Sequence, residues 1–397
     1  MSGFYVSGHS IYTVLSLQGA RNILSGEVHL KRFALLTCFL LCVLVLSLAL
    51  PGCGGGGSHR TLFIISAGNP AVGSFEIGNG GALTLNSTSI AAGSDPQVIV
   101  MDSKRRYAFV VNNAGPALAG GVLQYSIDHK HGTLAVVQAP NASSNLTTAA
   151  PPVVTGVQPM AAAIDPANGF VFVANYGSDS ISVFALDTTD GALTPVSGGV
   201  FQEPAGSKPV SLVARGTSLF VANRGTGNVA AYTFDSNGIL TLAGTVTVGA
   251  DTTAINADAG GGTLFVADGT ANTVTAISVS GATLTVGSST AVGTAPSSIS
   301  TDPSGKFLFV TNSGSNDLSA FSISGGSLTQ VSGSPFKTGA NPSFSTTNPA
   351  GSVLYVANKG DASVSSFQIS GGALTEAKGS PFAATGFNAP DGLAAAD

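Results

Sequence analysis

The polar side chains of this sequence that could contact a small molecule stand at the ends of short apolar runs. These candidates are Asn175, Tyr176, Asp179, Asn223, Arg224, Asp268, Asn312, Asn358 and Lys359. Amide and carboxylate groups hydrogen-bond the hydroxyl groups of ligands, and Arg and Lys can hold a carboxylate or a phosphate. The pattern therefore predicts a binding site for a small molecule, a glycan or a segment of another protein.

A structural role is the alternative for the Asn and Asp residues of this set. Six of the seven run ends are Asn or Asp, and the ends are Ser66, Asn112, Asn175, Asn223, Asp268, Asn312 and Asn358. Such side chains hydrogen-bond the turn that they begin, whereas a catalytic site needs different residues in different repeats. The better ligand candidates are therefore the irregular neighbours. These are Tyr176, Asp179, Arg224 and Lys359, joined by Gln202, Glu203, Lys208, Lys337 and Asp361 in nearby loops.

Several kinds of catalytic or binding chemistry are disfavoured by composition. The chain has 3 cysteines, Cys38, Cys42 and Cys53, all of which precede the repeats. The repeats contain two histidines, His129 and His131, and no Gly-x-Ser-x-Gly nucleophile motif or complete calcium-binding loop. We therefore expect no metal site and no cofactor. The net charge of −5, without a basic cluster, argues against nucleic acid as a partner.

The apolar runs form a repeat that must position these candidates. Their central aromatic residues are Phe63, Phe109, Phe172, Phe220, Phe265, Phe309 and Tyr355, about 45 residues apart except for one gap of 63. A period of about 45 residues with four short strands in each repeat is typical of β-propeller blades. The long gap contains a polar, Pro-rich insertion, residues 139–152, which we interpret as a surface loop.

The ends of the repeat array predict how the ring closes. No inner strand precedes the first apolar run, because residues 54–60 are a Gly-rich tether, whereas residues 390–397 have an inner-strand pattern with no blade after them. We therefore predict an all-β, seven-bladed propeller over residues 61–397, with four-stranded antiparallel blades and with the C-terminal strand joining the first blade. A second column should pack between blades: Phe75, Tyr125, Phe184, Tyr232, Ile277, Phe321 and Phe367.

Residues 1–53 form an N-terminal extension that contains a predicted export signal. Residues 33–50 are an uncharged apolar run preceded by Lys31 and Arg32, and Leu50–Cys53 follows. This arrangement resembles a bacterial lipoprotein signal, in which Cys53 would receive the lipid. A transmembrane anchor and an ordinary cleaved signal are the alternatives. All three place the propeller outside the cytoplasm, in the cell envelope, and we expect a monomer there.

The repeat resembles the seven-bladed β-propeller lactonase family, which includes 6-phosphogluconolactonase-like proteins, and related propellers with a Tyr-Val-Thr-Asn repeat. The residues that carry the resemblance are Gly305–Asn312, Gly169–Asp179 and the Gly-x-Leu-Thr hairpins. Enzymatic members typically have Pro-His, Asp-Arg and Asn-Glu pairs, and the corresponding positions here are Pro159-Met160, Asp179-Ser180 and Asn312-Ser313. We therefore expect a binding or scaffold protein without turnover. The alternative is a divergent hydrolase of sugar lactones.

Overall fold

The structure is a computed structural model that describes residues 59–397, except residues 87, 116–118, 138–151, 282 and 397. The chain divides into two units, Met1–Gly57 and Ser58–Asp397, and the described residues belong to the second. The predicted lipid acceptor Cys53 and most of the predicted insertion 139–152 lie outside them. In the described ranges the helical content is the 3₁₀ helix η1 (Asn79–Gly81), and no helix is long and apolar enough to cross a membrane.

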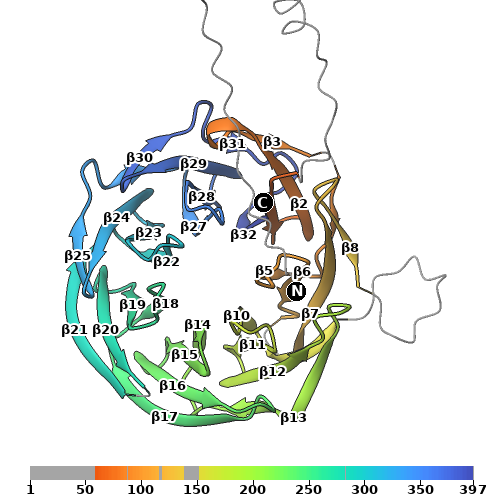
Figure 1. The fold of residues 1–397 in the computed structure, drawn as a ribbon, viewed down its shortest axis with the longest axis vertical. Helices are drawn as coiled ribbons and strands as arrows, with labels where there is room; N and C mark the ends of the chain where they lie inside the picture. The colour runs from red at the N-terminus through yellow and green to blue at the C-terminus, as the bar shows by residue number, and fades with distance from the viewer. Residues whose placement is uncertain (1–58, 87, 116–118, 138–151, 282, 397) are drawn as a thin grey trace, which may run out of the picture. The chain divides into compact units, whose positions relative to one another are not determined.

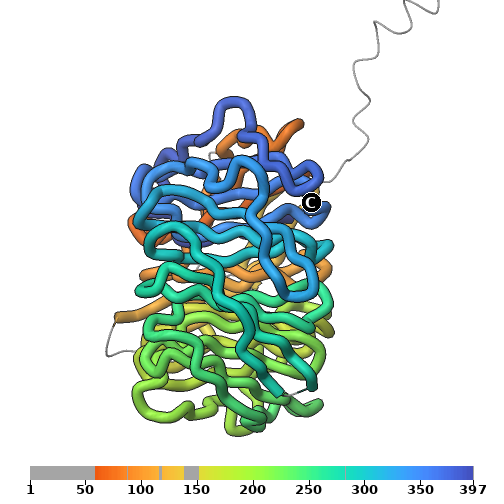
Figure 2. Tube along the Cα trace, turned by 90° about the vertical axis from the view of Figure 1, so that its left-hand side faces the viewer, coloured from red at the N-terminus to blue at the C-terminus, as the bar shows by residue number. Residues whose placement is uncertain are grey.

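Seven antiparallel sheets stand around a central tunnel, which confirms the predicted all-β propeller (Figure 1). Figure 2 shows the same ring edge-on, with the turns between strands gathered on its two faces. Blades 3, 4 and 5 each have four strands. Blade 3 contains β10 (Pro159–Ile164), β11 (Phe170–Asn175), β12 (Ser180–Leu186) and β13 (Leu193–Gln202). Blade 4 contains β14 (Pro209–Arg215), β15 (Ser218–Asn223), β16 (Asn228–Phe234) and β17 (Leu240–Thr247). Blade 5 contains β18 (Thr252–Ala257), β19 (Thr263–Asp268), β20 (Thr273–Ser280) and β21 (Thr283–Ala291).

In the other four blades a short fifth strand also pairs with the third. Blade 1 contains β32 (Pro390–Ala396), β1 (Thr61–Ser66), β2 (Ala71–Ile77), β3 (Leu83–Leu85) and β4 (Ile90–Ala91). Blade 2 contains β5 (Pro96–Met101), β6 (Tyr107–Asn112), β7 (Ala119–Asp128), β8 (Thr133–Val136) and β9 (Val153–Val157). Blade 6 contains β22 (Pro296–Thr301), β23 (Phe307–Asn312), β24 (Asp317–Ser324), β25 (Ser327–Gln330) and β26 (Phe336–Lys337). Blade 7 contains β27 (Pro342–Thr347), β28 (Val353–Asn358), β29 (Ser363–Ser370), β30 (Ala373–Glu376) and β31 (Phe382–Ala383).

The ring closes as the sequence predicts, because the last strand supplies the inner strand of the first blade. β32 pairs antiparallel with β1, with Thr61 opposite Ala396 and Ile65 opposite Gly392. The first and last described segments of the propeller therefore share one sheet. Without β32, the backbone N–H and C=O groups along one edge of β1 would have no ladder partner.

The second strand of each blade forms the core because it has a continuous apolar stretch, such as Leu219–Ala222, before its polar last residue. Strands buried on both faces need such continuous apolar runs. The column predicted to pack between blades does so: Phe184 belongs to the cluster between blades 2 and 3, and Tyr232 to the cluster between blades 3 and 4. These rings stabilise the contacts between neighbouring blades.

Each inner strand starts with a local irregularity that shapes the tunnel. Six of the seven begin with Pro and β18 begins with Thr252, and in all seven the register with the second strand shifts just after that first residue. Such a shift is a β-bulge, which leaves one residue outside the ladder and redirects its side chain. The residue before the Pro has a positive φ in several blades, for example 52° at Gln158 and 49° at Asn341.

Candidate ligand site in the central tunnel

A cavity of about 760 Å³ lies in the tunnel, and its lining extends from the start of the inner strands to the last residues of two of them, Thr301 and Thr347. The seven residues left outside the ladders by the bulges all line it, and they are Gln97, Met160, Val210, Thr253, Ser297, Ser343 and Asp391. Each blade therefore contributes one side chain to a ring around the cavity, which we call the bulge ring. Met160 of this ring is the residue that stands in the sequence where enzymatic members of the lactonase family typically have the His of a Pro-His pair.

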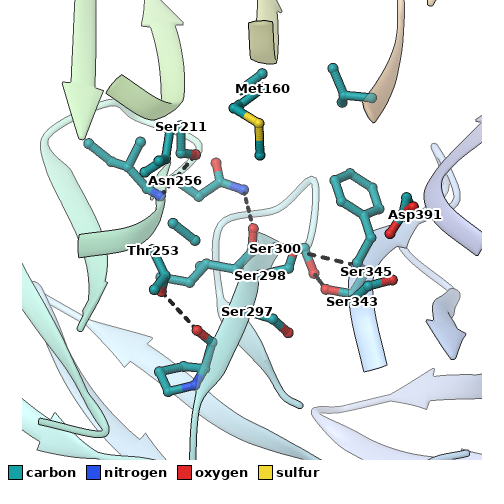
Figure 3. A pocket seen from close by; sticks show the side chains of 18 of the residues that line it. Met160, Ser211, Thr253, Asn256, Ser297, Ser298, Ser300, Ser343, Ser345 and Asp391 are labelled. Atoms are coloured by element: carbon teal, nitrogen blue, oxygen red, sulfur yellow. Dashed lines mark hydrogen bonds between the residues drawn. The ribbon is translucent and has the colours of Figure 1, made fainter. Parts of the chain in front are cut away.

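One side of the bulge ring is a belt of hydroxyl groups that links neighbouring blades. Each hydroxyl donates to the carbonyl oxygen of the residue that opens the inner strand of the next blade. The donor–acceptor distance is 2.8 Å for Thr253, 2.7 Å for Ser297 and 2.9 Å for Ser343. Figure 3 shows the Thr253 contact. The belt therefore joins blades 5, 6, 7 and 1. Because each proton is directed along the ring, a lone pair of each oxygen is left to accept from a ligand.

The polar wall continues below the bulge ring. The hydroxyl oxygens of Ser300 and Ser345 lie 2.8 Å apart, and the Asn256 side-chain amide donates to the carbonyl oxygen of Ile299 at 3.1 Å. These contacts again join blades 5, 6 and 7. The polar wall is therefore tied together by its own hydrogen bonds before any ligand binds, which preorganises it.

The opposite wall of the cavity is mostly apolar, although Gln97 and Ser211 also belong to it. Val98 and Val100 of blade 2, Met160 and Ala162 of blade 3 and Val210 of blade 4 line it. Met160 points into the cavity from the side opposite Ser298 and Ser300 (Figure 3). The cavity therefore presents hydroxyl groups on one side and hydrocarbon on the other, a combination that suits a molecule with both polar and apolar faces.

Two ion pairs stand at the rim of the cavity, each joining two blades. Arg224 of blade 4 holds Asp251 of blade 5 through two contacts, Nε to Oδ1 at 2.5 Å and a terminal guanidinium nitrogen to Oδ2 at 3.3 Å. Lys359 of blade 7 lies 2.6 Å from Asp391 of blade 1. Both cations were sequence candidates, and both line the cavity. Their carboxylate partners were not candidates: Asp251 directly precedes the inner strand of blade 5, and Asp391 is the second residue of the inner strand of blade 1.

The two carboxylates differ in environment. The Asp391 side chain is 15% exposed and Asp251 is 23% exposed. Burial raises the pKa of Asp391, and the Lys359 ammonium opposes this in part. Asp391 is therefore the carboxylate of the cavity whose proton affinity is increased by its surroundings.

The repeated Asn and Asp candidates lie within the blades and do not line the cavity. Asn175 is fully buried, and its amide donates to the hydroxyls of Ser180 at 3.2 Å and Ser182 at 3.0 Å. The amides of Asn312 and Asn358 make the equivalent contacts in blades 6 and 7. These three amides therefore bond to side chains of the strand that follows the turn, and not to the turn backbone that the structural interpretation predicts.

Asp268 and Asn223 follow the same plan with different partners. Asp268 accepts hydrogen bonds from the backbone N–H groups of Ala250, Thr270 and Ala271. Asn223 donates to the buried carboxylate of Glu203 at 2.6 Å. Both side chains therefore fasten the turns around them.

Tyr176 and Asp179 of blade 3 meet Lys208 in a cluster. The Lys208 ammonium lies 5.4 Å from the centre of the Tyr176 ring and 3.7 Å from an Asp179 oxygen. Burial would raise the pKa of Asp179, but the backbone N–H groups of Gly206 and Lys208 outweigh it and lower that pKa. The cluster closes the loop that leads into blade 4, and its residues are not among those that line the cavity.

Glu203 is a carboxylate buried between blades 3 and 4. It accepts from the Tyr232 hydroxyl at 3.0 Å as well as from Asn223, and 6% of its surface is exposed. Burial raises its pKa, although the two donors offset part of the effect. Its position in the packed interface points to a structural role.

Histidines and metal-type clusters do not contribute to the cavity in the described part of the chain. None of the residues that line it is His, and His129 and His131 bond to Arg105 and Asp128 in and near the turn after β7. Nor do the described residues contain a group of three His, Cys, Asp or Glu side chains that could hold a metal ion.

Similar propellers appear among solved structures. A periplasmic gluconolactonase from Pseudomonas aeruginosa is 19% identical with a TM-score of 0.72, over 86% of this chain and 99% of that one. A protein from Bacteroides fragilis, proposed to be a 6-phosphogluconolactonase, is 19% identical with a TM-score of 0.70, over 87% of this chain and 100% of that one. At these identities the likeness shows the fold. A comparison with curated proteins found no significant match.

The family comparison covers most of the propeller. The model of the lactonase family with a seven-bladed β-propeller matches residues 65–212, 192–292 and 282–385. The matched segments contain strands from all seven blades, which the structure arranges in one closed ring. The chain therefore belongs to the seven-bladed β-propeller lactonase family.

Proposed function

We propose that the tunnel cavity binds a small polyhydroxylated molecule of the sugar-acid or sugar-lactone class, and that this propeller works outside the cytoplasm as a lipid-anchored binding protein. The observation that carries the proposal is the division of the cavity into a hydroxyl wall and an apolar wall. Sugars and their lactones have hydroxyl groups around a ring and C–H groups on its faces. The cavity volume of about 760 Å³ lies within the usual range for small-molecule sites.

The rim favours ligands that carry a negative charge. The Arg224 side chain is 51% exposed and that of Lys359 is 42% exposed, so both cations can turn from their carboxylate partners toward an anion. An exposed ion pair contributes about 0–1 kcal/mol. Exchange for a ligand contact therefore costs least at Arg224, because its partner Asp251 is more exposed than Asp391, the partner of Lys359. A sugar acid or a sugar phosphate therefore suits this rim.

Binding is tested directly by titrating residues 54–397 with D-gluconate and with 6-phosphogluconate in a calorimeter. We expect saturable binding of both, tighter for the phosphorylated compound, and a loss of that preference in Arg224→Gln. Lys337→Gln, which changes a cation that does not line the cavity, is the matched control. No measurable heat with either compound at millimolar concentration would contradict the proposal.

The location rests on the N-terminal segment. The apolar run 33–50 followed by Cys53 and a glycine tether supports export and lipid attachment. The similar gluconolactonase from Pseudomonas aeruginosa is periplasmic, which agrees with this placement. The full chain should incorporate labelled palmitate, and Cys53→Ser should abolish the label. Label retained in Cys53→Ser would contradict the lipid anchor.

Lactone hydrolysis is the second candidate function, and the Asp391–Lys359 pair favours it. The buried Asp391 carboxylate would take a proton from water as the water oxygen attacks the lactone carbonyl carbon. Lys359 would stabilise the developing oxyanion, the ring C–O bond would break, and the departing ring oxygen would receive the proton from Asp391. The names of the similar gluconolactonases agree with this chemistry.

The two functions differ in turnover. If the protein only binds, residues 54–397 will not hydrolyse D-glucono-1,5-lactone above the spontaneous rate. Saturable turnover that Asp391→Asn abolishes and that the control Asp361→Asn retains would establish the hydrolase instead.

A further inference from the structure

One aromatic side chain stands among the seven inner strands as the structure describes them. It is Phe344, in β27 of blade 7. The other blades carry smaller side chains at the same register, two residues after the strand begins, namely Val98, Ala161, Ser211, Ala254, Ser298 and Gly392. Phe344 therefore breaks the sevenfold pattern of the tunnel wall at the level just below the bulge ring.

Phe344 contacts two cavities of the tunnel. It lines the candidate site and also a second cavity of about 370 Å³, and Val100, Thr346 and Thr347 line both cavities as well. It packs against the core cluster between blades 7 and 1 and against the cluster between blades 2 and 3. The ring therefore reaches past the inner strand of blade 1 and forms part of the wall of the candidate site.

The Phe344 ring and the hydroxyl belt offer a ligand two different kinds of contact. The half-buried Phe344 ring extends the apolar wall of Val98 and Val100, while Ser297 and Ser343 offer acceptor lone pairs from the hydroxyl belt. A closed sugar ring can place its apolar C–H face against the Phe344 ring and can donate hydrogen bonds to the belt from the hydroxyl groups along its edge. An open-chain polyol has no such face, and it loses more torsional freedom when it is bound.

We propose that Phe344 is the platform for the face of a closed-ring ligand, so that the site prefers the cyclic form of a sugar acid, its lactone, to the open chain. This inference rests on the proposed binding function and specifies its ligand. Phe344 is on this account a specificity-determining residue, and its effect should appear for one form of the ligand and not for the other.

The experiment compares a stable closed-ring probe, D-glucono-δ-lactam, with the open-chain probe D-gluconate. Phe344→Ser introduces the side chain that blade 6 has at this register. We expect it to weaken lactam binding about tenfold, the size of one aromatic contact, and to leave gluconate binding within about twofold. Phe336→Ser is the matched control, because Phe336 is half-buried in β26 and packs against Phe367, with ring centres 6.3 Å apart, away from the cavity.

The outcomes separate this inference from the proposed function. Equal weakening of both probes, or no weakening of either, overturns the role of Phe344 while the binding function stands. If neither probe binds the unaltered protein, both proposals fail. If Phe344→Ser has a clearly lower melting temperature than the unaltered protein, Phe344→Leu is used in its place. Leu keeps most of the side-chain volume but has no flat ring, so a selective loss of lactam affinity is still expected.

Discussion

The ammonium of Lys359 lies 2.6 Å from the carboxylate of Asp391, and this contact joins the end of β28 to the strand that closes the ring. Lys359 follows the second strand of blade 7, whereas Asp391 belongs to the strand that completes blade 1. Closure of the propeller and assembly of the candidate site are therefore the same event. A chain without β32 would lack both a blade edge and one charge of the cavity.

The first prediction concerns the proton affinity of Asp391. Lys359→Met removes the nearby cation while burial remains, so the pKa of Asp391 should rise further. A carboxyl group whose pKa is higher in the folded than in the unfolded state binds its proton more tightly in the folded state. The stability that this provides is lost as pH rises through the folded pKa, so the variant should lose more stability over that range than the unaltered protein. NMR titration of the Asp391 carboxyl carbon measures the shift, with Lys337→Met as control. An unchanged titration curve would show that the ion pair does not persist in solution.

Glu203 should make stability depend on pH. Its pKa is raised by burial, so its contribution is fully present below the pKa of the unfolded chain and is lost as pH rises through the folded pKa. Glu203→Gln removes the titration, and its urea-unfolding free energy should therefore vary less between about pH 4 and pH 7. The same measurement on Glu376→Gln, at the exposed end of β30, should reproduce the original pH dependence. Parallel pH curves for the original protein and Glu203→Gln would refute this assignment.

Asn175 should matter for stability and not for ligand binding. Asn175→Ala deprives the hydroxyls of Ser180 and Ser182 of a buried donor, which should cost about 1–3 kcal/mol of unfolding free energy. Urea denaturation measures this cost, and calorimetry with gluconate should show unchanged affinity. Asn237→Ala, on an exposed turn, is the matched control. A large loss of affinity at preserved stability would restore Asn175 to the ligand site.

Removal of residues 388–397 should destabilise the entire ring. The truncation deletes β32, and the backbone groups of β1 that face it then lose their ladder partners. It also removes the partner of Lys359. We expect a lower, broader thermal transition by circular dichroism. A melting temperature equal to that of the intact propeller would mean that the paired terminus contributes little to the cooperativity of the fold.

The fold is largely determined by sequence because its unit is local. Each blade forms from about 45 consecutive residues, so apolar runs such as Leu308–Val310 and turn signals such as Gly325-Gly326 repeat in register and can be counted. Counting strands also predicted closure, since residues 390–397 had no blade of their own. The same repetition favoured a structural role for the Asn residues at the ends of the apolar runs over a role in ligand binding.

The candidate site depends on tertiary structure because its contacts form between blades. Arg224 contacts the carboxylate of Asp251, 27 positions away in the chain, because blades 4 and 5 are neighbours in the ring. The bulge that turns Asp391 into the tunnel is a backbone irregularity, and Asp391 shows no sequence signal beyond its place after Pro390. Phe344 has an ordinary place in a strand, and only the closed ring brings it against blades 1, 2 and 3. Periodicity therefore determined the scaffold, and the closure of seven slightly different blades around one axis decided what faces the tunnel.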